Sequence, residues 1–179
     1  MAVSAGYSGL PVFVVHRHLA HQLHYDFRME AGGKLKSWAL PKGPSMNPKD
    51  KRLAIRVEDH SLDYKDFAGV IPEGYGAGIV EIWDKGRYEL EGIETKDISG
   101  VMKRSLASGH VSFILKGRKL KGKFALVRTG SKNSDAWLLI KQHDKFSTGK
   151  KYEAEYYTPA SSRINVTLTK REGSERFEK

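Results

Sequence analysis

Cysteine is absent from the 179 residues of this chain, which excludes disulfide bonds, thiolate zinc sites and cysteine nucleophiles. Long apolar runs are absent as well, since no stretch approaches the roughly 20 residues that a membrane helix needs. The first residues, MAVSAGYSGLP, also lack the charged and apolar regions of a signal peptide. We therefore expect a cytoplasmic protein without a membrane partner, in which histidines and carboxylates would hold any metal.

Acidic side chains are scarce relative to basic ones. Lysine and arginine number 31 against 21 aspartates and glutamates, which gives a formal net charge of +10. Such an excess favours a polyanionic partner, and nucleic acid is the obvious candidate. The densest basic run, KGRKLKGK at residues 116–123, fits that interpretation and equally fits a solvated hairpin turn.

The apolar pattern predicts one domain that is mainly β-structure. Short alternating segments recur with turn signals between them, which is typical of an antiparallel sheet curled into a barrel or sandwich. We expect strands near residues 12–18, 23–31, 34–40, 52–58, 79–84, 87–90, 111–116, 120–128 and 136–142. One helix is predicted between about Asp97 and Ala107, where apolar residues follow helical spacing.

Composition divides the chain into three parts. We expect a short N-terminal segment at residues 1–11, the folded domain at residues 12–147, and a polar, charged tail at residues 148–179. The apolar residues of the tail lie mainly in INVTL. We therefore expect it to form either an added strand or a loosely ordered arm.

The segment HLAHQLHYDFRME brings His18, His24, Asp26 and Arg28 close together in the sequence. From Leu23 to Met29 apolar and polar residues alternate strictly, so on a strand the two sets would face opposite ways. Same-face residues on a strand lie roughly 6.5 Å apart. His24 and Asp26 can therefore converge on one ion, with Arg28 reaching just beyond it.

The preceding run FVVHRH is also strand-like and places His16 and His18 on a common face. A tight connection through Leu19 to Gln22 would bring His18 back over His24. Two histidines and a carboxylate can hold a metal, and the arginine beside them can bind a phosphate.

A second polar face is predicted in RLAIRVEDH, residues 52–60, where Arg52, Arg56, Glu58 and His60 alternate with apolar residues. Arginines on such a face can grip phosphate, and Glu58 could orient an arginine or a metal-bound histidine. An exposed strand with ordinary ion pairs would show the same pattern.

Three further features flank these segments. Tyr64 follows His60 in HSLDY, and Lys42 sits between two prolines in LPKGPS, which would present its ammonium at a stiff loop. GYGAG, residues 74–78, lacks the Gly-Lys-Ser/Thr ending of a P-loop and is interpreted as a tight approach to the strand IVEIW.

Three function classes fit these residues. His24 and Asp26 with a distant histidine, His110 or His143, would imitate the facial triad of a non-haem iron oxygenase. His18 as the third ligand would instead suit metal-assisted phosphoester hydrolysis, which the net charge favours. A nonenzymatic nucleic-acid-binding barrel is the third class, but binding alone needs no such cluster.

The motifs HRHLAHQLHYDFRME, LKSWALPKGPS, KRLAIRVEDHSLDY, GVIPEGYGAG and WLLIKQHD occur in that order. Together they resemble the phosphoesterase module of bacterial and archaeal DNA ligase D over roughly residues 12–147. The resemblance implies a compact, crescent-like antiparallel β-barrel flanked by short helices. It also implies a hydrolase of end-joining DNA repair that depends on Mn²⁺, with Co²⁺ or Zn²⁺ as alternatives.

The activity implied by the resemblance is the trimming of 3' ends of DNA or of DNA/RNA primer-templates. A phosphodiesterase (3'-ribonuclease) step would remove 3'-terminal ribonucleotides, and a monoesterase step would remove 3'-phosphates. The partners would be the nucleic acid and, as separate chains, a ligase and a polymerase.

The resemblance also assigns roles to residues. His18, His24 and Asp26 would ligate the metal, while Arg28, His60 and Tyr64 would contact the scissile phosphate. Lys42, Arg52 and Glu58 match further polar positions of the family's active site. On this basis we expect Arg28 to offset charge in the transition state and His60 to act as a proton donor to the leaving oxygen.

The chain departs from the expected family pattern in three places. His16 stands where glutamine is expected, and the glycine loop EGYGAG is one residue shorter. Only about eleven residues precede the first motif, whereas an N-terminal extension helps to build the phosphate site in ligase D relatives. The monoesterase step is therefore the part of the resemblance with the least support.

Overall fold

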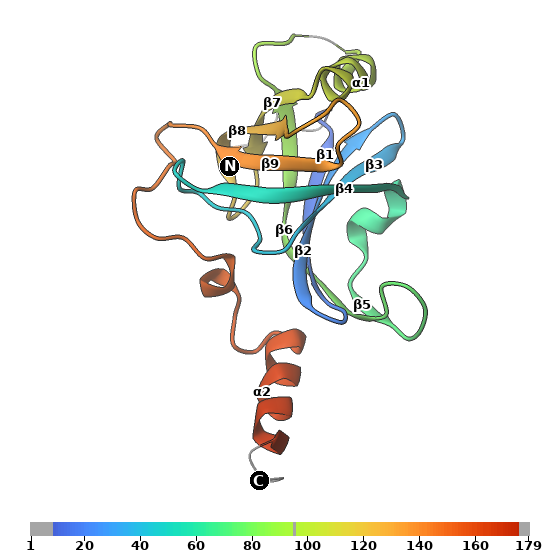
Figure 1. Cartoon of the computed structure of the whole chain (residues 1–179), viewed down its shortest axis with the longest axis vertical. Coiled ribbons are helices and arrows are strands. Elements are labelled where there is room, and N and C mark those ends of the chain that lie inside the picture. The colour runs from blue at the N-terminus through green and yellow to red at the C-terminus, as the bar shows by residue number, and fades with distance from the viewer. Residues whose placement is uncertain (1–8, 95, 176–179) are drawn as a thin grey trace, which may run out of the picture.

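A computed structural model describes residues 9–94 and 96–175 of the chain (Figure 1). Most of residues 1–11, the expected N-terminal segment, lies outside this range. The strands are β1 (Val12–Leu19), β2 (Leu23–Ala31), β3 (Lys34–Leu40), β4 (Lys51–Ser61), β5 (Gly69–Ile71), β6 (Gly78–Leu90), β7 (His110–Lys116), β8 (Lys121–Arg128) and β9 (Ala136–Lys141). The helices are α1 (Ile98–Ser108) and α2 (Arg163–Glu175), with 3-10 turns η1 (Leu62–Asp66) and η2 (Ala154–Tyr157).

The strands form one antiparallel sheet that closes on itself. Its order is β1-β2-β3-β4-β9-β8-β7-β6-β5, and β1 also pairs with β6. Eight strands therefore make a closed barrel, while short β5 pairs with the start of β6 outside the ring. The expectation of a mainly β, antiparallel barrel with short helices is confirmed.

Alternate residues of each strand fill the barrel. Phe13, Phe27, Trp38, Phe113 and Phe124 are fully buried and pack ring against ring in this core. Because large aromatic side chains bury the most apolar area per residue, this cluster supplies much of the driving force for barrel closure. The polar residues that alternate with these core residues consequently face outwards. On β1 and β2 such polar residues form the site described below.

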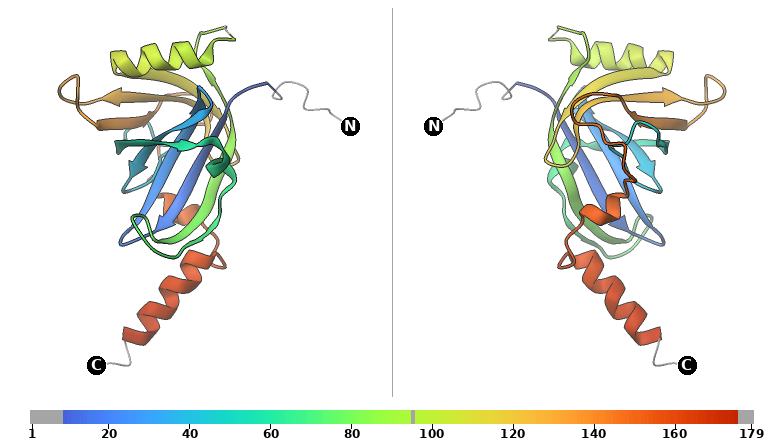
Figure 2. Two further views of the ribbon diagram at one scale, coloured as in Figure 1. Left: turned by 90° about the vertical axis from the view of Figure 1, so that its right-hand side faces the viewer. Right: turned by 90° about the vertical axis from the view of Figure 1, so that its left-hand side faces the viewer.

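Helix α1 covers one end of the barrel (Figure 2). Asp97 begins it by accepting a hydrogen bond from the Gly100 amide at 2.9 Å, and Gly109 ends it with a left-handed φ of 84°. Met102 faces the core and is fully buried. The predicted helix over residues 97–107 is confirmed to within one residue.

The separation of the expected strands 79–84 and 87–90 is wrong, because β6 runs without interruption through Asp84, Lys85 and Gly86. Asp84 accepts hydrogen bonds from the amides of Arg118, Lys119 and Leu120. A side chain at Gly86 would overlap the carbonyl oxygen of Lys116. Asp84 therefore holds the turn of the β7–β8 hairpin, which contains the basic run 116–123, and Gly86 leaves room for its backbone.

The tail forms η2 and α2, so the alternative of an added strand is wrong for residues 148–175. The Ser162 hydroxyl accepts from the Asn165 amide at 3.1 Å, which supports the first turn of α2, and Ile164 is fully buried. These local contacts outweigh the strand preference of the β-branched residues in INVTL.

The tail covers the end of the barrel opposite α1, from which α2 projects (Figure 2). Tyr152 and Ala154 are buried in the core cluster, and the Trp83 indole donates to the Ala154 carbonyl at 3.2 Å. Among the described residues, no helix is both long and apolar enough to cross a membrane.

Candidate metal and phosphate site

An open cleft of about 970 Å³ lies on the outer face of the β1–β2 hairpin. We call it the triad cleft; its walls include His18, His24, Asp26, Arg28, His60 and Tyr64. The hairpin, the end of β4, η1 and the loop between β5 and β6 supply these walls. The structure thus brings together six of the nine predicted site residues.

The three predicted metal ligands come from the two strands of the hairpin. The β1–β2 register places His18 opposite His24, as predicted from the tight connection. The Asp26 Oδ2 atom lies 3.6 Å from His18 Nδ1 and 3.4 Å from His24 Nε2. One ligand atom from each residue falls within 4.8 Å of the others, so a single ion could contact all three.

Backbone carbonyls fix which nitrogen each histidine turns towards Asp26. The Gly76 carbonyl lies 2.8 Å from His18 Nε2, and the Gln22 carbonyl lies 3.1 Å from His24 Nδ1. A carbonyl can only accept, so in the neutral form of each ring this nitrogen carries the proton and the other nitrogen presents a lone pair to the carboxylate. Metal-ligating histidines are commonly oriented in this way, by a hydrogen bond from the ring nitrogen that does not face the metal.

The donor set fits a divalent transition metal, because imidazole and carboxylate ligands suit Mn²⁺, Co²⁺ and Zn²⁺. Burial opposes ionisation of Asp26, but contacts with His18 and His24 and the charge of Arg28 outweigh it and hold the Asp26 pKa well below its usual range. A hydrogen bond with Asp26 raises the pKa of His24. A proton therefore competes with a metal for His24.

Arg28 is held rigidly at the edge of the triad. Only 4% exposed, its guanidinium lies 3.4 Å from Asp26 Oδ2 and donates to Ser37 Oγ at 2.9 Å. It also donates to His16 Nδ1 at 3.2 Å and approaches His60 Nδ1 at 3.0 Å. An oriented guanidinium beside a metal site is well suited to bind a phosphate oxygen.

His16 orients Arg28 from behind the cleft. Burial, followed by the charge of Arg28, lowers the pKa of His16 to about 3, so the imidazole is neutral. Its Nδ1 accepts from Arg28, and its Nε2 donates to the Phe67 carbonyl at 3.1 Å. A glutamine amide also offers one acceptor and one donor, so the glutamine expected from the resemblance could make the same two contacts.

His60 lies on the other side of Arg28. Its Nδ1 is 3.0 Å from both Arg28 Nη1 and the Glu58 carbonyl. The guanidinium only donates and the carbonyl only accepts, so a neutral ring can hydrogen-bond to just one of them through Nδ1. When Nδ1 accepts from Arg28, the ring proton lies on Nε2. Burial and the charge of Arg28 lower the pKa of His60. The lowered pKa favours the neutral imidazole, which can still donate a hydrogen bond. The role of His60 as proton donor to the leaving oxygen stays a prediction.

Tyr64 closes the site beneath Arg28. The Arg28 Cζ atom is 5.1 Å from the centre of the Tyr64 ring, and the His16 and His60 rings lie 5.2 and 5.1 Å from it. Burial raises the pKa of the Tyr64 phenol. The hydroxyl consequently stays protonated and can donate.

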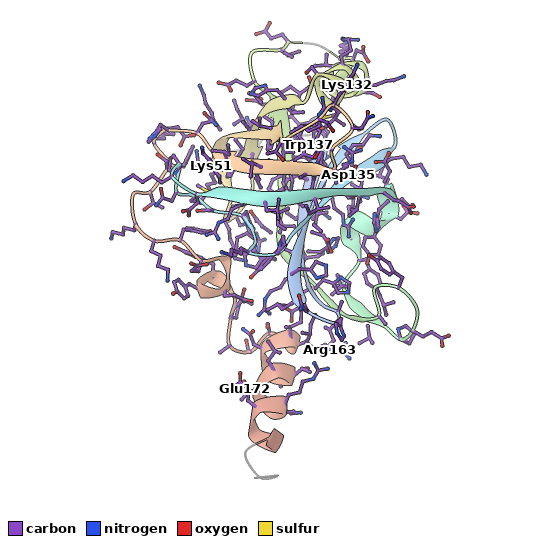
Figure 3. All side chains as sticks on the ribbon, in the orientation of Figure 1. Lys51, Lys132, Asp135, Trp137, Arg163 and Glu172 are labelled. Carbon is purple, nitrogen blue, oxygen red and sulfur yellow. The ribbon has the colours of Figure 1, made fainter. Side chains whose placement is uncertain are left out.

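Lys42 and Arg52 lie elsewhere, in a second cleft of about 470 Å³ that we call the basic cleft. Lys49 and Lys51 also line it, and Pro41 borders both clefts. Arg52 is 8% exposed and donates to the Tyr152 carbonyl at 2.6 Å, so it is tied to the tail. Figure 3 places Lys51 at the end of β4 that is remote from η1.

Glu58 is exposed and does not line the triad cleft. Pairing of β3 with β4 shifts between Leu35 and Ser37, which face His60 and Val57, so β4 carries one extra residue there. This bulge turns Val57 and His60 to the cleft and Glu58 away. The predicted common face of Arg52, Glu58 and His60 is therefore wrong.

Sequence reasoning missed Ser37, Phe67 and the backbone of Gly76. Ser37 could have been noticed, because a fully buried serine within the apolar strand LKSWAL needs a polar partner. The carbonyl contacts left no signal in the sequence. Neither His110 nor His143 lines the cleft, so the third ligand position falls to His18.

A closed antiparallel barrel with a His/His/Asp triad beside a fixed arginine defines a β-barrel protein with a candidate site for a metal ion and a phosphate. The model of one protein family, the DNA Ligase D 3'-phosphoesterase domain, matches residues 16–128, and the chain belongs to this family.

Relatives of known name agree with this assignment. The chain is 46% identical over 144 residues to the multifunctional non-homologous end joining protein LigD of Pseudomonas aeruginosa. The aligned region covers 76% of this chain and 16% of that protein. The chain is 43% identical over 127 residues to the LigD protein of Mycobacterium tuberculosis, covering 70% and 15%. The chain therefore spans about a sixth of the length of these relatives.

Proposed function

We propose that this chain is a metal-dependent 3'-phosphoesterase of end-joining repair that acts on DNA or DNA/RNA primer-template ends. It removes 3'-terminal ribonucleotides as a phosphodiesterase and 3'-phosphates as a monoesterase. The observation that carries the proposal is the convergence of ligand atoms of His18, His24 and Asp26, which lie within 4.8 Å of one another, with the Arg28 guanidinium 3.4 Å from Asp26. The family and the end-joining names of the relatives support the substrate.

His18, His24 and Asp26 would hold Mn²⁺, with Co²⁺ or Zn²⁺ as alternatives. When bound, such an ion supplies a Lewis acid that polarises a phosphate oxygen. Arg28 binds a second phosphate oxygen and offsets the negative charge that develops during displacement. Because His16 and Ser37 fix the guanidinium in advance, little reorganisation is needed when the substrate binds.

Two further side chains complete the phosphate site. The Nε2 proton of neutral His60 and the phenol of Tyr64 donate hydrogen bonds to the phosphate or to the leaving oxygen. Lys42 attracts the strand from the basic cleft across Pro41. Arg52 borders the same cleft and supports it from below, where it is tied to the Tyr152 carbonyl. Glu58 has an exposed carboxylate on the same strand as His60 and would contact a bound strand only by turning inwards.

The test is to incubate the protein with a labelled primer-template whose primer ends in one or two ribonucleotides, with and without Mn²⁺. A second substrate ends in a 3'-phosphate. We expect metal-dependent shortening of the first and loss of phosphate from the second. Both should disappear in His24→Ala and persist in His143→Ala, a matched change at an exposed histidine outside the cleft.

No metal-dependent product on either substrate would overturn the proposal. Tight binding of the primer-template without turnover would instead favour the nonenzymatic nucleic-acid-binding barrel. Product from the first substrate alone would restrict the activity to the diesterase step.

A further inference from the structure

The loop between β5 and β6 carries an unusually open aromatic side chain. Tyr75 has a relative exposure of 109%, the largest value for a large apolar side chain among the described residues. It nevertheless lines the triad cleft. Figure 1 shows this loop curving beside β5, near the tip of the β1–β2 hairpin.

The backbone on either side of Tyr75 is firmly placed. Gly76 provides the carbonyl that accepts from His18, and the Ala77 amide donates to the Gly74 carbonyl at 3.1 Å. Gly74 and Gly76 both have φ of 89°, a left-handed conformation that favours glycine. Tyr75 therefore leaves the backbone one residue from a metal-ligand contact, at a Cα spacing of about 3.8 Å from Gly76.

The space beside Tyr75 exceeds what a metal and a phosphate require. The cleft measures about 970 Å³, close to the upper end of the roughly 300–1,000 Å³ found for small-molecule sites. On the opposite wall, Tyr64 is already in contact with Arg28 and stacks on Phe67, with ring centres 4.9 Å apart. The Tyr75 ring, in contrast, is exposed to solvent and is available to contact a ligand in the cleft.

A solvated aromatic ring at the rim of a phosphate site matches the chemistry of a nucleobase. Bases stack on aromatic side chains regardless of sequence because every base has a π-face. We propose that Tyr75 stacks with the base of the terminal nucleotide and so positions its 3' phosphate over the triad. This inference rests on the proposed function, and it makes Tyr75 a positioning residue that favours ends bearing an intact base.

The test compares Tyr75→Ala, Tyr75→Phe and wild type on primer-templates with a normal or an abasic terminal nucleotide. We expect Tyr75→Ala to raise KM about tenfold for the normal end, the size of one base–aromatic stack, with little change in kcat. Tyr75→Phe should behave as wild type because it keeps the ring. On the abasic end, wild type and Tyr75→Ala should have equal KM.

Tyr156→Ala is the matched control, because Tyr156 is 68% exposed on η2 and does not line the cleft. Binding is followed separately with 2-aminopurine at the 3' terminus and the inactive His24→Ala protein. We expect the His24→Ala protein to quench the 2-aminopurine fluorescence. The double variant that also carries Tyr75→Ala should not quench it.

Quenching that survives Tyr75→Ala, or a KM increase equal for normal and abasic ends, would overturn the stacking role. Failure of the wild-type protein to turn over any substrate would overturn the proposed function instead, so the two outcomes are distinguishable.

Discussion

At the scale of single residues, two backbone carbonyls decide which ring nitrogens the triad offers to a metal. When both rings are neutral, the contacts of Gly76 with His18 and of Gln22 with His24 leave a lone pair of each ring directed at Asp26. Asp26 then provides the only negative charge of the three. Its carboxylate should dominate the affinity for a divalent ion.

Asp26→Asn should abolish tight Mn²⁺ binding. The expected loss exceeds the about 10–100-fold that follows removal of an outer-shell partner, because a charged ligand is lost. Titration calorimetry with Mn²⁺ measures the affinity directly. Asp59→Asn is the control, since Asp59 is exposed and pairs with Lys36 and Arg56. Equal affinities of Asp26→Asn and wild type would place the metal elsewhere.

Mn²⁺ affinity should fall as the pH is lowered through the raised pKa of His24. Contact with Asp26 favours the protonated imidazole, and a metal must displace that proton. In the metal-free protein, folding stability depends on pH in the opposite direction to metal affinity. Protonated His24 stabilises the fold fully below the ordinary histidine pKa of about 6.5, and this stabilisation is lost as the pH rises through the raised pKa. Calorimetric titrations between acidic and neutral pH test both statements, and a pH-independent affinity would contradict them.

His16 should tolerate glutamine but not alanine. His16→Gln keeps an acceptor for Arg28 and a donor for the Phe67 carbonyl, so activity should stay within a few-fold of wild type. His16→Ala frees the guanidinium, and kcat should fall about tenfold. This is less than the about 10²–10³-fold loss for removing a preorganised donor outright, because the guanidinium itself remains. Mn²⁺ affinity, measured alongside, should change little in either variant. A fall in affinity equal to the fall in kcat would show that His16 acts on the triad instead.

At the scale of elements, β2 could be predicted from its sequence and β4 could not. Tyr25, Phe27 and Met29 are buried in the core while His24, Asp26 and Arg28 line the cleft, as strict alternation requires. The bulge in β4 interrupts the same alternation before His60. It depends on pairing with β3, so the residues of β4 alone give no sign of it.

The hydrogen-bond network around Arg28 could not be predicted from the sequence either. It joins His16, Ser37 and His60 from three different strands. A sequence pattern reports which face of a strand a residue occupies, but not which residues of other strands it meets. The family resemblance supplied the roles of His60 and Tyr64 for that reason.

Gly78 at the start of β6 should not tolerate alanine. Its φ is 146°, and an added Cβ would overlap the Leu19 carbonyl at the end of β1. Gly78→Ala should lower the free energy of unfolding by about 1–3 kcal/mol or more, the range for a strained backbone residue. Gly33→Ala is the control, because Gly33 has φ of 72° but open space around it. Urea denaturation should give a much lower free energy of unfolding for Gly78→Ala than for Gly33→Ala. Equal free energies would refute the steric argument.

At the scale of the whole molecule, Arg17 joins the barrel to the tail. It is 1% exposed and lies 3.3 Å from a Glu81 oxygen and 2.7 Å from a Glu155 oxygen. It also donates to Asn165 Oδ1 at 2.6 Å. One side chain of β1 therefore contacts β6, η2 and α2, and Figure 3 shows Arg163 where α2 leaves the barrel.

Arg17→Met should destabilise the protein and loosen the tail. Removing one partner of a buried ion pair costs about 3–5 kcal/mol, but Glu155 is half-exposed and regains water, so we expect about 2 kcal/mol. Urea denaturation gives this value, and limited proteolysis should cut first within residues 154–175. Arg104→Met, an exposed change on α1, is the control. Unchanged stability with an unchanged proteolysis pattern would show that the tail is held without Arg17.

The hairpin that carries all three proposed metal ligands has a consequence for how the protein folds. His18, His24 and Asp26 belong to strands that are adjacent in sequence, whereas β1 must find β6 far along the chain to close the barrel. Local hairpins form in about 1–10 μs, and distant pairings are slower because more chain entropy is lost. The metal-binding half of the site can therefore assemble before the phosphate-binding half, and a metal captured early would bias the chain towards the correct strand register.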